Sequence, residues 1–408
     1  MYFPFDRKKT SVKELFLINQ TSLNGKKLFL TKIIKKSRTL PLILVAIIVI
    51  ITTNAVADDE NIFMKGWHAM TKNHILRLIS ENTYDNITAV AWSPDGKSIA
   101  TAGGLPTDVV IWDAASLSIR KQLNQGARGL GLDNITFSSD GQYLVSGLKI
   151  INVWKIADGT TQATLIAPHI TPGIPQEVDI VSLRFSPDGK MLVVVHGGKK
   201  RIVIAYRTEN WQIAWSYEPK EITRFTTPLV FTPDGKFVIL GEGELVASGS
   251  GYRFRPKILF LDAKSGKYLR SIDNIHTDNP TALAISPNGK WVATGTTTGS
   301  TDTILYPQGN NDPVRIWNVD TGKLVKELPV QSRVWSLAFS RDGKYLFGAK
   351  SQIHTHLTLA VWDIEAGMMV QEIKNNPGPI SLAVSPDGRR LAAACDNKLS
   401  IYEITSGN

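Results

Sequence analysis

The chain has 408 residues, a formal net charge of +10 and one cysteine, Cys395. A single cysteine excludes an intrachain disulfide framework and the cysteine-rich zinc motifs. Residues 1–57 carry ten Lys or Arg and two acidic residues, which leaves residues 58–408 with only +2 of the net charge. A body so close to neutral gives no reason to expect a nucleic-acid partner.

The first 57 residues have the pattern of a secretory signal. A basic stretch ending at Arg38 precedes the apolar run Leu40–Ile51, and Ala55-Val56-Ala57 follows it. This order predicts export, with cleavage after Ala57 and a mature chain beginning at Asp58 in the periplasm, at the cell surface or outside the cell. The alternative is a single uncleaved membrane anchor, because residues 40–57 are uncharged throughout and near the minimum length of a membrane span.

After a short arm at residues 58–73, one four-residue turn occurs seven times. Each begins with Ser or Thr, and Asp or Asn followed by Gly closes it: Asp95-Gly96, Asp140-Gly141, Asp188-Gly189, Asp234-Gly235, Asn288-Gly289, Asp342-Gly343 and Asp387-Gly388. These residue types favour a tight hairpin turn, since Asp accepts local hydrogen bonds and Gly adopts the left-handed conformation. The turns lie 45 to 54 residues apart, and such a period indicates an array of like units.

Apolar or alternating segments flank every turn, so each turn is predicted to join two strands. A third predicted strand ends on a large aromatic residue in five repeats: Trp112, Trp154, Trp317, Trp362 and Tyr402. Four short strands per repeat are typical of a propeller blade. We therefore predict an all-β fold, a seven-bladed β-propeller of four-stranded antiparallel blades over residues 74–408. Because the last repeat has three strands, the N-terminal segment His74–Ile79 is expected to close the ring.

At this point the sequence resembles the Trp-Asp (WD) repeat proteins over nearly all of residues 74–408. The resemblance is carried by the seven turns and by the pairs Trp112-Asp113 and Trp362-Asp363. No repeat has the Gly-His dipeptide of that family. The resemblance therefore implies a looser, prokaryotic WD-like propeller in which the buried His–Asp–Trp hydrogen-bond network is absent.

Two rings of residues bear on the chemistry of the propeller. A cation follows the turn glycine in six blades, at Lys97, Lys190, Lys236, Lys290, Lys344 and Arg389. The aspartates of the same turns nearly neutralise this ring, so we interpret it as a solvated face. The column expected to line the tunnel is Thr88, Asp133, Val181, Thr227, Thr281, Trp335 and Ile380. One carboxylate is too few for acid–base chemistry or a metal cage, so we predict no catalytic residue, cofactor or metal.

Three consecutive blades carry extra length between their second and third strands, at Gly241–Lys257, Gly295–Val314 and Lys350–Leu357. We expect these segments to be loops on one side of one rim. The candidate partner-binding residues are Tyr252, Arg253, Arg255, Tyr306, Trp335, His354 and His356. Aromatic residues and arginine dominate binding hot spots, although surface loops also tolerate added length without any function.

The leading hypothesis is an exported, non-catalytic propeller that serves as a protein-binding platform. Under this hypothesis the protein has no nucleic-acid partner, and it contacts a membrane only through the N-terminal segment, if that segment is retained. The alternative is a periplasmic or secreted quinoprotein-like oxidoreductase or hydrolase that uses the tunnel. Titratable residues at the tunnel mouth would favour the enzyme, whereas an apolar or merely polar tunnel would favour the platform.

Overall fold

The computed structural model describes residues 74–103, 108–124, 135–147, 150–166, 180–197, 201–218, 228–248, 251–296, 312–330, 332–352, 356–374 and 380–405. The chain divides into two compact units, Met1–Lys72 and Asn73–Asn408, and all described residues belong to the second. The predictions made for the leader and the arm lie outside these residues. Within the described ranges, no helix is long and apolar enough to cross a membrane.

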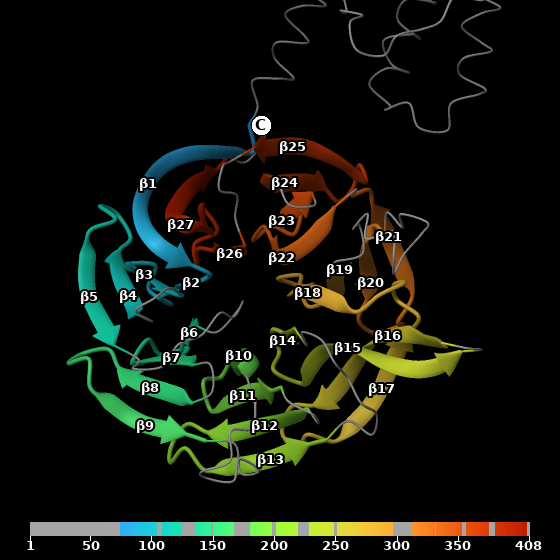
Figure 1. Ribbon diagram of the computed structural model, residues 1–408, viewed down its shortest axis with the longest axis horizontal. Coiled ribbons are helices and arrows are strands. Elements are labelled where there is room, and N and C mark those ends of the chain that lie inside the picture. The colour runs from blue at the N-terminus through green and yellow to red at the C-terminus, as the bar shows by residue number, and fades with distance from the viewer. Residues whose placement is uncertain are drawn as a thin grey trace, which may run out of the picture. The chain divides into compact units, whose positions relative to one another are not determined.

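The described residues form seven antiparallel sheets arranged around a central axis, as predicted (Figure 1). The first three blades are β2 (Ala89–Trp92), β3 (Ser98–Ala102), β4 (Asp108–Asp113) and β5 (Ile119–Asn124); β6 (Ile135–Phe137), β7 (Tyr143–Gly147), β8 (Ile151–Lys155) and β9 (Thr161–Leu165); and β10 (Ile180–Phe185), β11 (Met191–His196), β12 (Ile202–Arg207) and β13 (Ile213–Tyr217). The first strand of each blade lies nearest the axis and the fourth lies at the circumference (Figure 1).

Blades four to six repeat this order. They are β14 (Leu229–Phe231), β15 (Phe237–Ser248), β16 (Gly251–Asp262) and β17 (Tyr268–Asp273); β18 (Pro280–Ile285), β19 (Trp291–Thr296), β20 (Val314–Asn318) and β21 (Leu324–Leu328); and β22 (Arg333–Phe339), β23 (Tyr345–Gln352), β24 (His356–Asp363) and β25 (Met368–Lys374). Strands β15 and β16 are twice the length of most other strands, which sets the fourth blade apart.

The seventh blade confirms the predicted closure by an N-terminal strand. β1 (Leu76–Ile87) pairs antiparallel with β27 (Arg390–Ile404), which pairs in turn with β26 (Ser381–Val384). The Ile404 amide donates to the Arg389 carbonyl at 2.8 Å, so the two ends of β27 lie side by side. β27 therefore supplies both the second and the third strand of this blade, and β1 supplies the fourth.

Each repeated turn is held by its own side chains. In the first blade the Ser93 hydroxyl donates to Asp95 Oδ1 at 2.6 Å, and the same oxygen accepts the Lys97 amide at 3.0 Å. The seven turn glycines have φ between 68° and 75°, where a side chain would be strained. Gly96 lies against Pro386, the second residue of the seventh turn. Contacts of this kind link each turn to the one before it, so the turns themselves form a closed ring.

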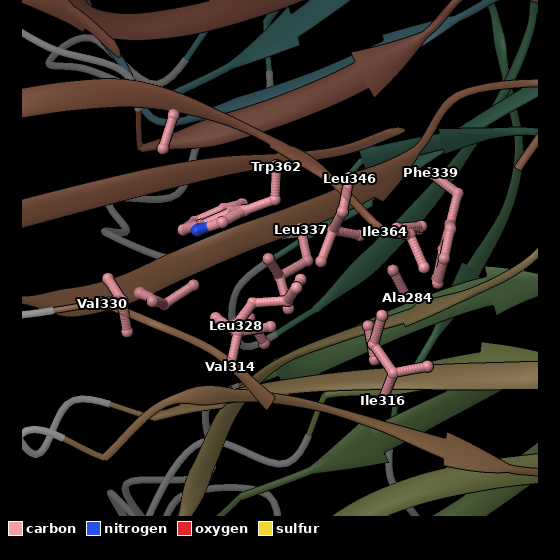
Figure 2. Packing of buried hydrophobic residues seen from close by; sticks show 14 residues of the cluster. Ala284, Val314, Ile316, Leu328, Val330, Leu337, Phe339, Leu346, Trp362 and Ile364 are labelled. Atoms are coloured by element: carbon pink, nitrogen blue, oxygen red, sulfur yellow. The ribbon is translucent and has the colours of Figure 1, made fainter. Parts of the chain in front are cut away.

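The hydrophobic core lies between adjacent blades. Figure 2 shows the cluster between blades five and six, where Trp362 and Leu346 of blade six face Val314 and Ile316 of blade five. Trp362 is fully buried, and a Cβ at Gly348 would lie 2.4 Å from its ring. Residue 348 is therefore a glycine, because the indole occupies the space that a side chain would need. Burying a large aromatic residue contributes about 2–3 kcal/mol.

Hydrogen bonds at the circumference also tie blades together. In each blade, the aromatic residue at the end of the third strand, or the residue in its place, pairs with a residue on the fourth strand. In five blades, the side chain two positions further along the fourth strand donates a hydrogen bond to a backbone carbonyl of the following blade. These contacts are Lys121 to Ile156, Trp215 to Ala263, Arg270 to Val319, Lys326 to Glu365 and Gln371 to Leu76. The residue types differ, but each carries a donor at a similar reach. The ring is therefore fastened at its edge as well as at its core.

Candidate partner-binding site

The most prominent feature of the rim is a two-stranded ribbon on blade four. The prediction of a loop at Gly241–Lys257 was wrong: β15 and β16 stay paired from Phe237 with Asp262 to Ser248 with Gly251. The ribbon extends beyond the rest of its sheet (Figure 1). Sequence alone missed this because Gly241, Gly243 and Gly251 suggest irregular backbone. The alternation of Tyr252 and Phe254 with Arg253 and Arg255 was the signal that could have revealed it.

A buried charge cluster lies at the base of the ribbon. Glu242 of β15 is 3% exposed, and the Lys257 ammonium lies 3.7 Å from its Oε2. Arg201, at the start of the third blade's third strand, is 7% exposed. Burial lowers the pKa of Arg201 to about 10, although the negative charge of Glu242 acts against this shift. Buried carboxylates need such cationic partners, so the cluster fixes the point from which the ribbon projects.

The ribbon also packs against the next blade. A Cβ at Gly243 would lie 1.2 Å from Asn279 Oδ1, which shows how closely the two meet. Asn279 is 4% exposed and precedes the first strand of blade five. Only glycine fits at 243, because any side chain there would displace Asn279. The base of the ribbon is therefore held from both neighbouring blades.

Blade six has a shorter extension of the same kind. The predicted loop at Lys350–Leu357 was wrong in part, since β23 and β24 remain paired out to Gln352 and His356. The Lys350 ammonium lies 2.6 Å from Glu372 Oε1, and the Thr358 hydroxyl donates to the same oxygen at 3.2 Å. Burial works to raise the pKa of Glu372, but the Lys350 contact outweighs it and the pKa lies below its usual range.

Blade five, between these two extensions, contains a buried His–Asp–Trp hydrogen-bond network. The lack of a Gly-His dipeptide had predicted that this network would be absent. That expectation was wrong for this blade. The Thr294 hydroxyl lies 2.7 Å from His276 Nε2 and accepts the Trp317 indole N–H at 3.1 Å. On the other side of the ring, His276 Nδ1 lies 3.4 Å from Asp312 Oδ2. The histidine follows an isoleucine here, so a search for Gly-His could not find it.

Asp312 is the centre of this network. It is 5% exposed and accepts hydrogen bonds from the Thr277 amide and from Arg315 Nη1, both at 2.7 Å. Burial works to raise the pKa of Asp312, but its contacts with His276, Thr277 and Arg315 hold it well below the usual range. Asp312 ends the predicted loop Gly295–Val314, most of which lies outside the described residues. The network thus anchors the returning end of that segment.

The seven candidate residues fall into four groups. Tyr252, Arg253 and Arg255 lie on β16 in the ribbon, opposite Ala247, Val246 and Glu244, and Arg255 is exposed. His356 is the first residue of β24. Tyr306 and His354 lie outside the described residues.

Trp335 is apart from the others, on the innermost strand β22, and it is half-buried. Its indole N–H donates to Ser351 Oγ at 2.9 Å. The backbone thus places three of the seven candidates on one element. The assignment of all seven as binding residues stays a prediction.

The tunnel wall bears on the alternative, enzymatic reading. Strands β2, β6, β10, β14, β18, β22 and β26 contain no Asp, Glu, His or Cys within their bounds. Thr88, Val181, Thr281, Trp335 and Ile380 of the predicted tunnel column are half-buried, whereas Asp133 and Thr227 lie outside the described residues. Among the residues that the structure places, no three His, Cys, Asp or Glu side chains come together as a metal site would require.

Comparison with known proteins agrees with this architecture. The family model "WD domain, G-beta repeat" matches residues 74–113, 266–305, 322–363 and 367–403. An uncharacterized WD repeat-containing protein of Synechocystis sp. is 31% identical over 164 residues, which are 38% of this chain and 41% of that protein. The matched region thus spans less than half of that relative's length. Seven four-stranded blades, matches to the WD model in four places and the similarity to a WD repeat-containing protein support a WD-repeat family of β-propellers for this chain.

Proposed function

We propose that the protein is an exported, non-catalytic platform that binds another protein through the rim of blades four to six. WD propellers generally mediate protein–protein interactions, and the ribbon gives this chain a specific place for one. The observation that carries the proposal is the ribbon's rigid support. Its base is fixed by the buried Glu242–Lys257 pair and by the close contact between Gly243 and Asn279. Functional surfaces are often built as projections from a rigid scaffold in this way.

The composition of the ribbon supports the same proposal. Tyr252, Arg253 and Arg255 are residue types that contribute most to binding hot spots. Their backbone lies on β16 beyond the part of that strand that pairs with β17. The innermost strands, by contrast, offer no carboxylate that could act as acid or base in the tunnel within the described residues. The binding function is therefore better supported than the quinoprotein-like oxidoreductase or hydrolase.

Export is the second part of the proposal, and it rests on the leader sequence. Intact-mass analysis of the protein recovered from its producing cells tests it, with a mature chain beginning at Asp58 as the expected result. Retention of residues 40–57 would mean a membrane anchor instead.

Affinity capture followed by cross-linking mass spectrometry tests the binding function. We expect a captured protein to cross-link to blades four to six and not to the face that bears the repeated turns. A captured partner that cross-links only to the turn face would overturn the proposed site.

A further inference from the structure

The outer edge of the ribbon is an unpaired strand edge. On one side β16 pairs with β15 along its whole length, but on the other it pairs with β17 only from Lys257 to Leu261. Over residues 251–256 no strand of the described structure lies on that side. Such an edge presents backbone donors and acceptors that can pair with another chain. The outermost strand of each blade also has an unpaired side, but this edge differs because it belongs to a ribbon that extends beyond the rest of its sheet (Figure 1).

The direction of the backbone groups along this edge follows from one contact. The Pro256 carbonyl accepts the Ile275 amide at 3.2 Å, on the side away from β15. Because hydrogen-bonding directions alternate along a strand, Phe254 and Tyr252 direct their N–H and C=O groups to the same outer edge. Pro256 has no N–H and so loses no ladder bond to β15 there. Within the part of the chain that the structure describes, these groups of Tyr252 and Phe254 have no strand partner, and two such residues are enough to begin a strand pairing.

The register also assigns the ribbon two different faces. Glu242 and Lys257 lie opposite one another and their side chains pair at 3.7 Å, which defines the charged face. With a side-chain period of two, Arg253 and Arg255 share the face of Lys257. Tyr252 and Phe254 belong to the opposite face. The acidic residues of the charged face are on β15, so the edge formed by β16 is cationic.

We propose that the partner adds a strand along β16 at residues 251–256, and that this strand alternates acidic with apolar residues. This inference rests on the proposed platform function and specifies how the platform is used. Acidic residues of the added strand would lie beside Arg253 and Arg255, and its apolar residues beside Tyr252 and Phe254. Cross-strand pairs of opposite charge and of aromatic with β-branched residues stabilise such a pairing.

The same charges argue against a second copy of this chain as the partner. Antiparallel pairing of two β16 strands about Phe254 would set Arg253 directly opposite Arg255 in both halves. Like charges directly opposite one another destabilise a sheet. The cationic edge therefore selects a different chain with acidic residues over a copy of itself.

Short synthetic peptides test the proposal on the protein as isolated from its producing cells. The probe alternates Glu with Val; one control replaces Glu by Lys, and another methylates alternate backbone nitrogens of the Glu peptide. We expect the probe to bind and both controls to bind at least about ten-fold more weakly. Equal binding of the methylated peptide would overturn strand addition, because that peptide keeps the side chains and loses only the backbone donors.

Variants separate the backbone from the side chains. Phe254→Pro removes an N–H from the outer edge while the ladder to β15 stays intact, so it should abolish binding of the probe. Phe254→Leu keeps the N–H and is the matched control. The double variant Arg253→Glu with Arg255→Glu should transfer the preference to the Lys peptide. An unchanged melting temperature shows that each variant is folded, and unchanged probe binding by Phe254→Pro would overturn the proposal.

This inference and the proposed function fail in different ways. A natural partner that cross-links to blades four to six and binds Phe254→Pro as well as wild type overturns strand addition and leaves the platform standing. A partner that binds elsewhere on the ring overturns both. Dimers of this chain that dissociate in Phe254→Pro, seen by analytical ultracentrifugation, would identify a second copy as the occupant and overturn the acidic partner.

Discussion

The side-chain amide of Gln371 bonds both backbone groups of Leu76. Gln371 Nε2 donates to the Leu76 carbonyl at 2.8 Å, and Gln371 Oε1 accepts the Leu76 amide at 2.9 Å. One residue belongs to the last strand of blade six and the other begins the closing strand β1, 295 residues away in sequence. The ring closes through this contact as well as through the β1–β27 ladder, because it replaces two hydrogen bonds that an edge strand would otherwise lack.

Replacement of Gln371 by Ala should lower the free energy of unfolding by about 1–3 kcal/mol, since two backbone groups of Leu76 lose their partner. Chemical denaturation measures the change. Gln122→Ala is the matched control, because Gln122 also lies on an outermost strand and, among the described residues, its side chain donates to the Tyr84 hydroxyl instead of bonding backbone groups. Its effect should stay within about 0.5 kcal/mol. Equal effects of the two substitutions would mean that the Leu76 contact contributes nothing specific.

Removal of residues 58–80 should destabilise the ring more severely, by several kcal/mol. The truncation takes away the first part of β1, including Leu76, which is 2% exposed, and leaves the end of β27 unpaired. Differential scanning calorimetry should record a markedly lower melting temperature. A thermal transition identical to that of the intact mature chain would show that β1 is dispensable for closure.

The repeats made most of the fold predictable from sequence. Each turn carries its own hydrogen bonds, so a pattern such as Ser93 to Gly96 specifies local structure with little help from the rest of the chain. The closing strand followed from counting strands in the last repeat. The ribbon could not be predicted so directly, because its strands are supported from outside. Glu242 and Gly243 make sense only beside Arg201 and Asn279, which lie about 40 residues away on other blades.

The network of blade five was missed for a similar reason. Its His276 and Asp312 are separated by 36 positions, and strands β18 and β19 lie between them in the sequence. A search for the adjacent pair Gly-His therefore finds neither His276 nor Asp312. The added length of blades four and six was therefore located from the sequence, but its form as paired strands was not. The spacing of the repeated turns shows which repeats contain extra residues. Pairing between strands decides whether those residues form a loop or a ribbon.

Asp312→Asn should destabilise the protein at neutral pH by about 3 kcal/mol, because it removes the buried negative charge that pairs with Arg315 Nη1 and His276. The folded-state pKa of Asp312 lies below its ordinary value. Its contribution is therefore fully present above about pH 4, the unfolded value, and is lost as the pH falls through the folded pKa. Urea titrations between pH 7 and pH 3 should show a smaller acid loss in the variant. Asp320→Asn, in an exposed turn, is the control and should retain the wild-type pH profile.

His196 predicts a second pH effect on stability, at less acidic pH than that of Asp312. It is fully buried on β11, and neither ring nitrogen has a hydrogen-bond partner. Burial lowers its pKa to about 4. The unfolded chain takes up a proton near pH 6.5 while the folded one does not, so stability should fall between about pH 6.5 and pH 4 by about 3 kcal/mol. His196→Leu should remove this slope, and a variant that keeps the same slope would assign it to another group.

The last prediction concerns the ribbon itself. Tyr252→Ala with Arg253→Ala should weaken binding of a captured partner by at least about 2 kcal/mol, because aromatic residues and the planar guanidinium of arginine are the groups that dominate binding hot spots. Both residues lie beyond the part of β16 that pairs with β17, so the melting temperature should barely change.

The control is Lys236→Ala with Lys290→Ala on the turn face, where the Thr232 hydroxyl and the Lys236 backbone amide hold the pKa of neighbouring Asp234 at about 2 and the charges balance locally. Isothermal titration calorimetry compares the two double variants. Equal affinity of wild type and the Tyr252/Arg253 variant would remove the ribbon as the binding site. A loss in the lysine variant alone would move the binding surface to the face formed by the seven turns, since the two sites lie at opposite ends of the same strands.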